Sequence, residues 1–255
     1  LDFGCMGLGP IFESIGRNLA ATPLLSSVVL GGSLLHLAGS AAQQDRWLAP
    51  LIAGDLRLAL ALDEQARHAP QGTVLEARAD GDGYCLEGDK YWVLDGLGAD
   101  AYLVAARVAG MAGDEQGISL FLLPASTPGL TCSALPLIDA RNCARLRLEQ
   151  VRVGRDALLG EPGQGWTRLD LALDRGRACL AAELLGAAEQ LFETTLEYLK
   201  TRVQFDTPIG SFQALQHRAA QLYVDLALSR SAVMAALSAL DDSSLDAAAR
   251  GRLVS

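Results

Sequence analysis

Two short segments combine residue types that could bind an ion or a phosphate. Asp80-Gly81-Asp82-Gly83 has the alternating acidic pattern that opens a calcium loop, but the later oxygen ligands and the distal Glu are absent. The pattern therefore predicts a tight turn. The glycine-rich segment 161–165 (EPGQG) has no Lys and lacks the GxGxxG order of a dinucleotide fingerprint, so we expect a loop that precedes a helix.

The histidine and tryptophan side chains indicate no specific chemistry on their own. The three histidines show no metal-ligand spacing, and His217 on a predicted long helix is typical of a packed or solvated residue. Trp92 in a predicted strand is, on composition alone, typical of a core residue. No order of residues predicts a Ser-His-Asp, Cys-His or paired-carboxylate site.

The composition excludes several classes of protein. The 255 residues carry a net charge of −9 and are 50% hydrophobic, which argues against disorder and against a basic nucleic-acid-binding face. Five separated cysteines without a CxxC pair favour a reducing compartment over a disulfide framework or a zinc site. We expect neither a membrane-spanning run nor a signal peptide.

The hydrophobic pattern divides the chain into helices, then strands, then long helices. Helical spacing predicts helices over 10–19 (with Pro10 at the start), 24–37, 43–52, 166–201, 212–240 and from 245. Alternating or apolar runs predict strands over 74–79, 84–86, 90–94, 101–107, 118–124, 130–135 and 144–151. A turn at 87–89 would make a hairpin, and the strand spacing suggests a sandwich or barrel.

Five motifs, in order, resemble stretches of the acyl-CoA dehydrogenase family. RVQFDTPIGSFQ at 202–213 resembles the family signature RxQFGxPIxxFQ. Three others are QQDRWLAPLIAGD at 43–55, GYCLEGDKYWVLDG at 83–96 and VRVGRDALLGE at 151–161. They resemble EQKxxxLPxLxxGE, GxYxLNGxKxWITNG and VxVPxxxLLGxxGxG. DRGR at 174–177, with Gly186, is similar to the helix that follows in the family.

The resemblance implies an α+β fold of three domains. These are a partial N-terminal helical domain (1–57), a middle β-barrel domain (58–160) and an incomplete C-terminal helical bundle (161–255). The first and last helices of the family fall outside the chain, so we expect it to be part of a longer protein.

The resemblance also implies a reaction: FAD-dependent α,β-dehydrogenation of an acyl-CoA thioester. In the family a carboxylate removes the α-proton, a hydride leaves to the flavin, and electrons pass to an electron-transfer flavoprotein. It implies a homo- or hetero-oligomer, a dimer or tetramer. We expect a cytoplasmic location, and no metal, nucleic acid or membrane span.

The FAD contacts implied by the resemblance come from two parts of the chain. Trp92 matches the residue that packs against the flavin, and Arg202 matches the arginine that reaches the pyrophosphate across a dimer interface, an anion that suits a guanidinium. The other matching positions are Leu62, Asp63, Leu94, Phe205, Phe212 and Gln213.

Several of these positions depart from the family pattern. Asp63 replaces a threonine, and Leu94 replaces a threonine whose hydroxyl bonds flavin N5. Asp206 replaces a glycine beside the phosphate position, where it adds a negative charge. These departures weaken the predicted flavin contacts.

The substrate side lacks an identified base. Asp174 and Arg177 match the family residues that line the CoA-thioester site. The catalytic Glu of the family lies either beyond the position of Ser255 or just before Arg177, where this chain has Gly176, which cannot accept a proton.

The resemblance leaves three interpretations open. The chain belongs to an acyl-CoA dehydrogenase, to an oxidase with the same fold, or to a non-catalytic structural subunit of a heteromeric dehydrogenase. The length and type of the acyl chain depend on pocket side chains that the motifs do not fix.

Overall fold

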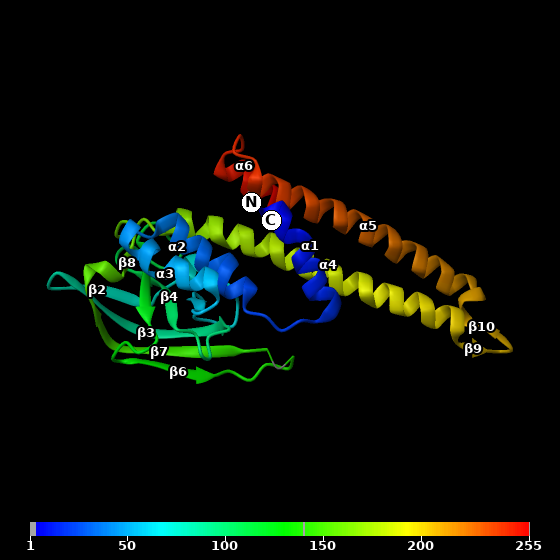
Figure 1. The fold of residues 1–255 in the computed structure, drawn as a ribbon, viewed down its shortest axis with the longest axis horizontal. Coiled ribbons are helices and arrows are strands. Elements are labelled where there is room, and N and C mark those ends of the chain that lie inside the picture. The colour runs from blue at the N-terminus through cyan, green and yellow to red at the C-terminus, as the bar shows by residue number, and fades with distance from the viewer. Residues whose placement is uncertain (1–3, 140, 255) are drawn as a thin grey trace. The chain divides into compact units, whose positions relative to one another are not determined.

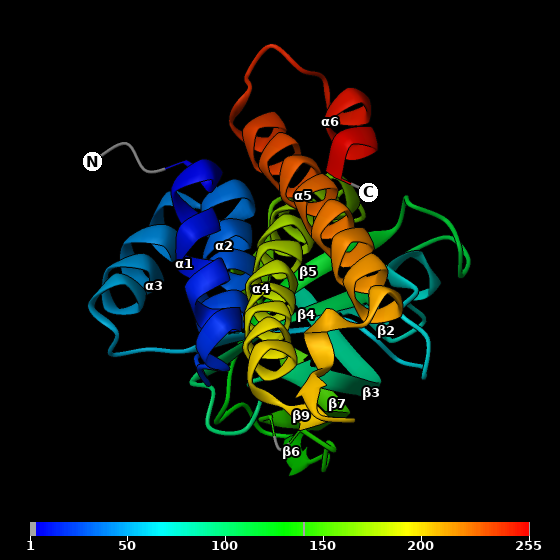
Figure 2. The ribbon, with the colours of Figure 1, turned by 90° about the vertical axis from the view of Figure 1, so that its right-hand side faces the viewer.

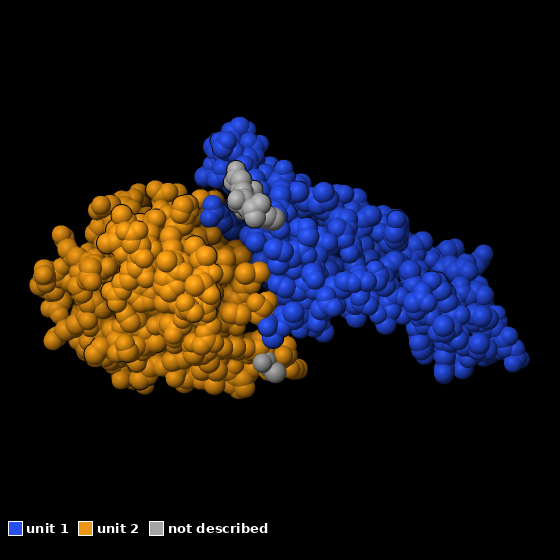
Figure 3. Space-filling model, in the orientation of Figure 1, with its two compact units in different colours: residues 1–21, 174–255 blue, residues 22–173 orange. Residues whose placement is uncertain are grey.

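A computed structural model describes residues 4–139 and 141–254, and the chain divides into two compact units. Residues 1–21 and 174–255 form the first unit, and residues 22–173 form the second (Figure 3). Each unit buries its own set of apolar side chains.

The second unit is built on one eight-stranded sheet (Figure 1). Its strands are β1 (Leu58–Ala61), β2 (Glu76–Asp80), β3 (Gly83–Leu94), β4 (Ala101–Arg107), β5 (Ile118–Pro124), β6 (Leu130–Ala134), β7 (Cys143–Val153) and β8 (Leu158–Leu159). They pair in the order β6-β7-β3-β2-β4-β5-β8, and β1 pairs with β4. The strands and helices together confirm the α+β fold class.

Strand β4 is buried on both faces of the sheet. Tyr102 and Val104 belong to one apolar core, while Leu103 and Ala105 belong to a second core that α2 (Ser33–Ala38) joins with two leucines. Successive side chains of a strand point to opposite faces, so a strand covered on both sides reads as a continuous apolar run. The bounds predicted for β4 and β5 are confirmed.

Helical segments precede the sheet in this unit. They are a π-helix (Leu24–Gly32), α2 and α3 (Ala41–Ala53). Helix α3 begins with a capping box in which Ser40 Oγ accepts from Gln43 N at 3.3 Å and Gln43 Oε1 accepts from Ser40 N at 2.8 Å. It ends at Gly54, whose φ of 82° is left-handed and free of strain for glycine. The helices predicted over 24–37 and 43–52 are confirmed.

The hairpin predicted at 87–89 is wrong. Strand β3 runs without a turn and pairs with β2 on one side and β7 on the other. Gly88 has φ 142° and lies at a register shift of the β3–β7 pair, so it forms a bulge. A glycine inside a strand pattern can mark a bulge as well as a turn, and the sequence did not separate the two.

The first unit consists of long helices. They are α1 (Cys5–Asn18), most of α4 (Trp166–Thr201), α5 (Gln213–Asp241) and α6 (Ala247–Val254). A hairpin of β9 (Val203–Gln204) and β10 (Thr207–Pro208) connects α4 to α5 (Figure 2). The helices predicted over 166–201 and 212–240 are confirmed.

Helix α1 begins at Cys5 rather than at Pro10. The carboxylate of Asp241 accepts hydrogen bonds from Cys5 N at 2.7 Å and Met6 N at 2.8 Å. It satisfies backbone donors that have no partner within the helix, and its negative charge suits a helix N-terminus. The predicted start was wrong because this cap comes from the far end of α5.

Helices α1 and α4 approach closely through two glycines. A Cβ on Gly16 would lie 1.7 Å from Glu183 O, and one on Gly186 would lie 2.0 Å from Glu13 O. These distances leave no room for a side chain at either position, so the crossing requires glycine on both helices.

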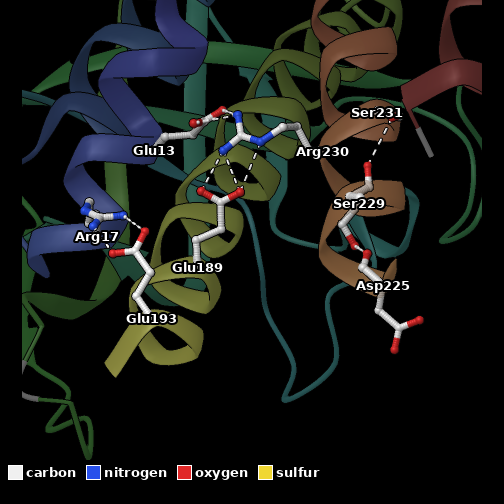
Figure 4. A network of polar contacts seen from close by, with 9 residues as sticks. Glu13, Arg17, Glu189, Glu193, Asp225, Ser229, Arg230 and Ser231 are labelled. Atoms are coloured by element: carbon white, nitrogen blue, oxygen red, sulfur yellow. Dashed lines mark hydrogen bonds and ion pairs between the residues drawn. The ribbon is translucent and has the colours of Figure 1, made fainter. Parts of the chain in front are cut away.

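An ion-pair network joins the helices beside this crossing (Figure 4). Arg230 of α5 binds Glu13 of α1 at 3.1 Å and Glu189 of α4 at 2.6 Å. Arg17 of α1 pairs with Glu193 of α4. The network links α1 to α4 and α5, which are distant from it in sequence.

Among the described residues, α5 is long and apolar enough to cross a membrane by length and composition. The expectation that no apolar run would reach this length is therefore wrong. One such helix is weak evidence for a span, because a helix that packs against a partner has the same composition. Its exposed apolar side chains are Leu222, Tyr223, Val224, Leu228 and Met234.

Candidate functional site

A bulge in β3 exposes Trp92 at the surface of the sheet. The β3–β7 register shifts between Lys90 and Val93, and Trp92 has φ 57°. Lys90 is buried while Trp92 is 43% exposed, although residues two apart in a regular strand share one face. Trp92 is therefore not a core residue, contrary to the prediction from composition. A bulky residue in the left-handed region is strained, and such strain clusters at functional sites.

The loop after β1 fixes the Trp92 indole. Trp92 Nε1 donates to Gln65 O at 3.0 Å, and Tyr91 N donates to Asp63 O at 2.7 Å. Leu62 is buried, whereas the Asp63 side chain is 18% exposed. The structure thus brings Leu62, Asp63 and Trp92 together, and their role stays a prediction.

Two substitutions relative to the family pattern change the chemistry of this surface. Leu94 is 39% exposed at the end of β3 and has no hydroxyl to donate to a flavin. The Nδ1 atom of His68 lies 3.0 Å from both carboxylate oxygens of Asp63. A carboxylate–imidazole pair therefore stands where the family pattern has a neutral threonine.

Sequence reasoning gave no role to Glu64, which falls in the stretch that resembles the family V-T-E-P run, or to Lys90 of the motif at 83–96. The Nζ atom of the fully buried Lys90 donates to Glu64 Oε1 at 2.6 Å and to Leu62 O at 2.9 Å. Burial lowers the pKa of Lys90 to about 8, although the charge of Glu64 acts to raise it. A lysine two positions before Trp92 was the available signal, but only the bulge shows that it points inward.

Asp174 and Arg177 contact each other one turn apart on α4. Asp174 Oδ1 lies 2.5 Å from Arg177 Nη1, and the two side chains are 7% and 39% exposed. Gly176 is buried in the same turn and supplies no base. The other expected position, beyond Ser255, lies outside the described residues.

The β9–β10 hairpin places Phe205 and Asp206 at its tip. Their φ angles of 55° and 60° are those of a type I′ turn. Phe205 is 88% exposed, and its ring meets Phe212 edge-on at 6.2 Å between centroids. The exposed guanidinium of Arg202 makes no hydrogen bond or ion pair with residues 4–139 or 141–254, and Gln213 is exposed at the start of α5.

The predicted residues of the helical unit lie toward opposite ends of α4. From Arg177 to Thr201, the last residue of the helix, the axis extends roughly 36 Å at 1.5 Å per residue. One chain therefore does not bring Asp174 and Arg177 to the hairpin that carries Arg202. A site that used both groups would need a second chain, either another copy or a different subunit.

The residues present fit FAD in part. An exposed indole suits stacking on a flat ring, and an exposed guanidinium suits a pyrophosphate. Leu94 leaves the hydroxyl donor missing. Within the described parts of the chain no three metal-ligating side chains gather, and the five cysteines are free thiols.

Two family models match the chain. The middle domain of acyl-CoA dehydrogenase matches residues 63–151, and the C-terminal domain of acyl-CoA dehydrogenase matches residues 163–253. The probable acyl-CoA dehydrogenase YngJ of Bacillus subtilis (strain 168) is 33% identical over 231 residues, which cover 88% of this chain and 60% of that protein.

Solved structures of similar proteins share the fold of this chain. Butyryl-CoA dehydrogenase from Megasphaera elsdenii superposes with a TM-score of 0.80 at 29% identity, over 91% of this chain and 61% of that one. A chain of the ChsE4-ChsE5 complex from Mycobacterium tuberculosis superposes with a TM-score of 0.83 at 31% identity. The match covers 99% of this chain and 66% of that one. This chain thus spans 60–66% of the length of these three proteins.

Both family models match in chain order, the middle domain over most of the sheet and the C-terminal domain over the long helices, which defines the class as a β domain followed by a helical bundle. The chain belongs to the acyl-CoA dehydrogenase family. The resemblance read from the five motifs is confirmed.

Proposed function

We propose that this chain is part of an enzyme that uses FAD to dehydrogenate the Cα–Cβ bond of an acyl-CoA thioester. The observation that carries the proposal is the Trp92 ring, which is 43% exposed in a strained bulge and held by its bond to Gln65 O. A ring that is already fixed loses little conformational freedom when a flat ligand stacks on it.

The chain's own residues would bind and orient. Trp92 would support the flavin ring, with Leu62 and Asp63 beside it, and Arg202 with Phe205, Phe212 and Gln213 would hold the pyrophosphate end from a neighbouring copy. The Asp174–Arg177 pair would orient the thioester. FAD, when bound, supplies the hydride acceptor. The base would come from a part of the protein outside the described residues.

The proposal includes partners. The separation along α4 and the exposed apolar side chains of α5 support a dimer or tetramer. The electron acceptor would be an electron-transfer flavoprotein, and the compartment a reducing cytoplasm. The same proposal includes the domain boundaries expected from the resemblance, with the middle domain beginning at residue 58 and the C-terminal domain at residue 161. Because one structural relative is named a butyryl-CoA dehydrogenase, a four-carbon thioester is the first substrate to test.

A second candidate is a structural subunit without its own chemistry. Gly176 at one base position and Leu94 at the N5-donor position favour it. So does the similarity to a chain of a two-component complex. In this case the partner would carry the base and the flavin contacts that this chain lacks.

The visible spectrum of the purified full-length protein separates the two candidates. The enzyme is expected to be yellow, and butyryl-CoA added without oxygen is expected to bleach the flavin band. A colourless protein that binds no added FAD would contradict the first proposal and support the second. Bound FAD without bleaching by thioesters of several lengths would contradict the dehydrogenase assignment.

A further inference from the structure

A buried ion pair lies behind the exposed ring of Trp92. We propose that Glu64 and Lys90 are positioning residues that close the 62–75 segment and thereby hold the Trp92 ring and the Asp63 carboxylate in a fixed arrangement. The inference rests on the proposed function only for the identity of the ligand that uses this surface.

Glu64 joins the two ends of the 62–75 segment. Its Oε2 accepts from Val74 N at 2.8 Å and its Oε1 accepts from Leu75 N at 2.9 Å. The same Oε1 accepts from Lys90 Nζ at 2.6 Å, and Nζ also donates to Leu62 O at 2.9 Å. One carboxylate and one ammonium therefore tie the start of the segment, its end and strand β3 together.

Arg107 fixes the second half of the segment independently. Its Nε donates to Thr73 O at 2.7 Å and its Nη2 donates to Gln71 O at 2.9 Å, while its own N donates to Leu75 O at 2.7 Å. Arg107 is 7% exposed. Because this end is anchored on β4, the Glu64 carboxylate transmits a fixed position to the start of the segment.

The start of the segment holds the exposed groups. Gln65 O accepts from the Trp92 indole and Asp63 O accepts from Tyr91 N. Both acceptors flank Glu64 in sequence. Any shift of Glu64 therefore moves the acceptor that fixes the indole and the residue whose carboxylate faces His68.

Stability alone is a weak reason for this arrangement. Removing two charges from water costs free energy, and an apolar pair of similar volume often stabilises a core as well or better. Burial lowers the pKa of Lys90 to about 8, which indicates that its charge is costly in the fold. The best-attested use of a buried pair is to specify one conformation, and here the specified conformation is that of a surface.

The test measures the indole directly. In full-length protein with nitrogen-15-labelled tryptophan, the Trp92 Nε1–H resonance is assigned by its loss in Trp92→Phe. Lys90→Met is expected to shift this resonance and to raise its hydrogen-exchange rate by about tenfold or more, because the acceptor Gln65 O is released. Glu64→Gln should act in the same direction but less, since the amide keeps one acceptor oxygen.

A second measurement is the dissociation constant of FAD, determined by flavin-fluorescence titration. We expect this constant to rise about tenfold in Lys90→Met. The matched control is Arg152→Met, which breaks an exposed pair with Asp80 on the same sheet and should change neither quantity. If Lys90→Met and Glu64→Gln unfold more easily than wild type but keep the wild-type indole resonance and exchange rate, the pair is merely structural and the inference is overturned.

Failure of the proposed function gives a different result. A wild-type protein that binds no FAD would contradict the proposed function, while the indole exchange rates would still decide the positioning role. If Lys90→Met does not fold, Glu64→Gln carries the test, and an unchanged Trp92 indole in that variant would overturn the inference.

Discussion

The sheet surface around Trp92 and the β9–β10 hairpin carry the two groups of predicted FAD contacts, and they are built in opposite ways. Around Trp92 the indole donates to Gln65 O, and the charges behind it are buried and paired. On the hairpin, Phe205 is 88% exposed and Arg202 has no side-chain partner among the described residues. The first surface is preformed by its own chain, while the second presents exposed groups that make few contacts within the described residues.

The physical difference lies in what holds each group. A buried pair depends on both members, because the loss of one leaves an uncompensated charge in a poorly solvated site. An exposed cation is solvated whether or not it has a partner, so it contributes little to stability. Substitutions near Trp92 should therefore change folding, and substitutions in the hairpin should change binding alone.

The largest expected effect tests the sheet side. Lys90→Met should lower the free energy of unfolding by about 3 kcal/mol, because the charge of Glu64 loses its buried partner. Urea unfolding followed by circular dichroism measures this. The double variant Glu64→Gln/Lys90→Met should recover most of the loss, since no buried charge remains. A double variant as unstable as the sum of the two single variants would contradict the role of charge.

The pH dependence of stability tests the same pair. Burial lowers the folded-state pKa of Lys90 from 10.5 to about 8, with Glu64, Asp63 and Arg107 as the charged groups that act on it. Between these values the unfolded state binds more protons, so the contribution of Lys90 to the free energy of unfolding rises with pH. Between pH 8 and 10, the free energy of unfolding of the wild type should rise relative to that of the Glu64→Gln/Lys90→Met double variant. A constant difference would mean that the pKa is not depressed.

The hairpin is tested by a change in binding without a change in stability. Arg202→Ala should weaken FAD binding by about 30-fold, or ~2 kcal/mol, because a charge-assisted bond to phosphate is lost. Its free energy of unfolding should stay within about 0.5 kcal/mol of wild type. The matched control is Arg218→Ala, an exposed arginine of α5. Equal losses of FAD affinity in both variants would exclude Arg202 as a specific contact.

Periodicity in the sequence predicted most of the regular elements, but it missed β1 and the contacts between distant residues. Periodicity located α4 and β4, because their packed faces repeat along the chain. The start of α1 was missed because its cap, Asp241, lies 236 residues from Cys5. No local pattern reports such a partner.

The candidate site shows the same limit. The motif resemblance selected Trp92 and Arg202, yet the exposure of Trp92 follows from a bulge that alternation cannot locate. The 2.6 Å contact between Glu64 and Lys90 was missed because the two residues are 26 positions apart in the sequence. Asp174 and Arg177, by contrast, are three apart on a helix, where spacing alone predicts contact.

The smallest expected effect separates charge from backbone conformation at the hairpin tip. Asp206 has φ 60°, a left-handed conformation that Asp and Asn tolerate and that glycine adopts freely. Its carboxylate lies four residues from Arg202, so it would repel the phosphate that Arg202 is proposed to bind.

Asp206→Asn removes the charge but keeps a side chain suited to this conformation, whereas Asp206→Gly changes both. If charge dominates, both variants should tighten FAD binding about threefold, or ~0.7 kcal/mol, at low ionic strength. The gain should largely disappear at about 0.5 M salt, because the hairpin is exposed and salt screens its charges. If only Asp206→Gly tightens binding, and salt does not reduce the gain, turn conformation rather than repulsion limits the hairpin. If neither variant alters FAD affinity at any salt concentration, the tip does not approach the pyrophosphate, and the assignment of the hairpin as the second half of the site fails with it.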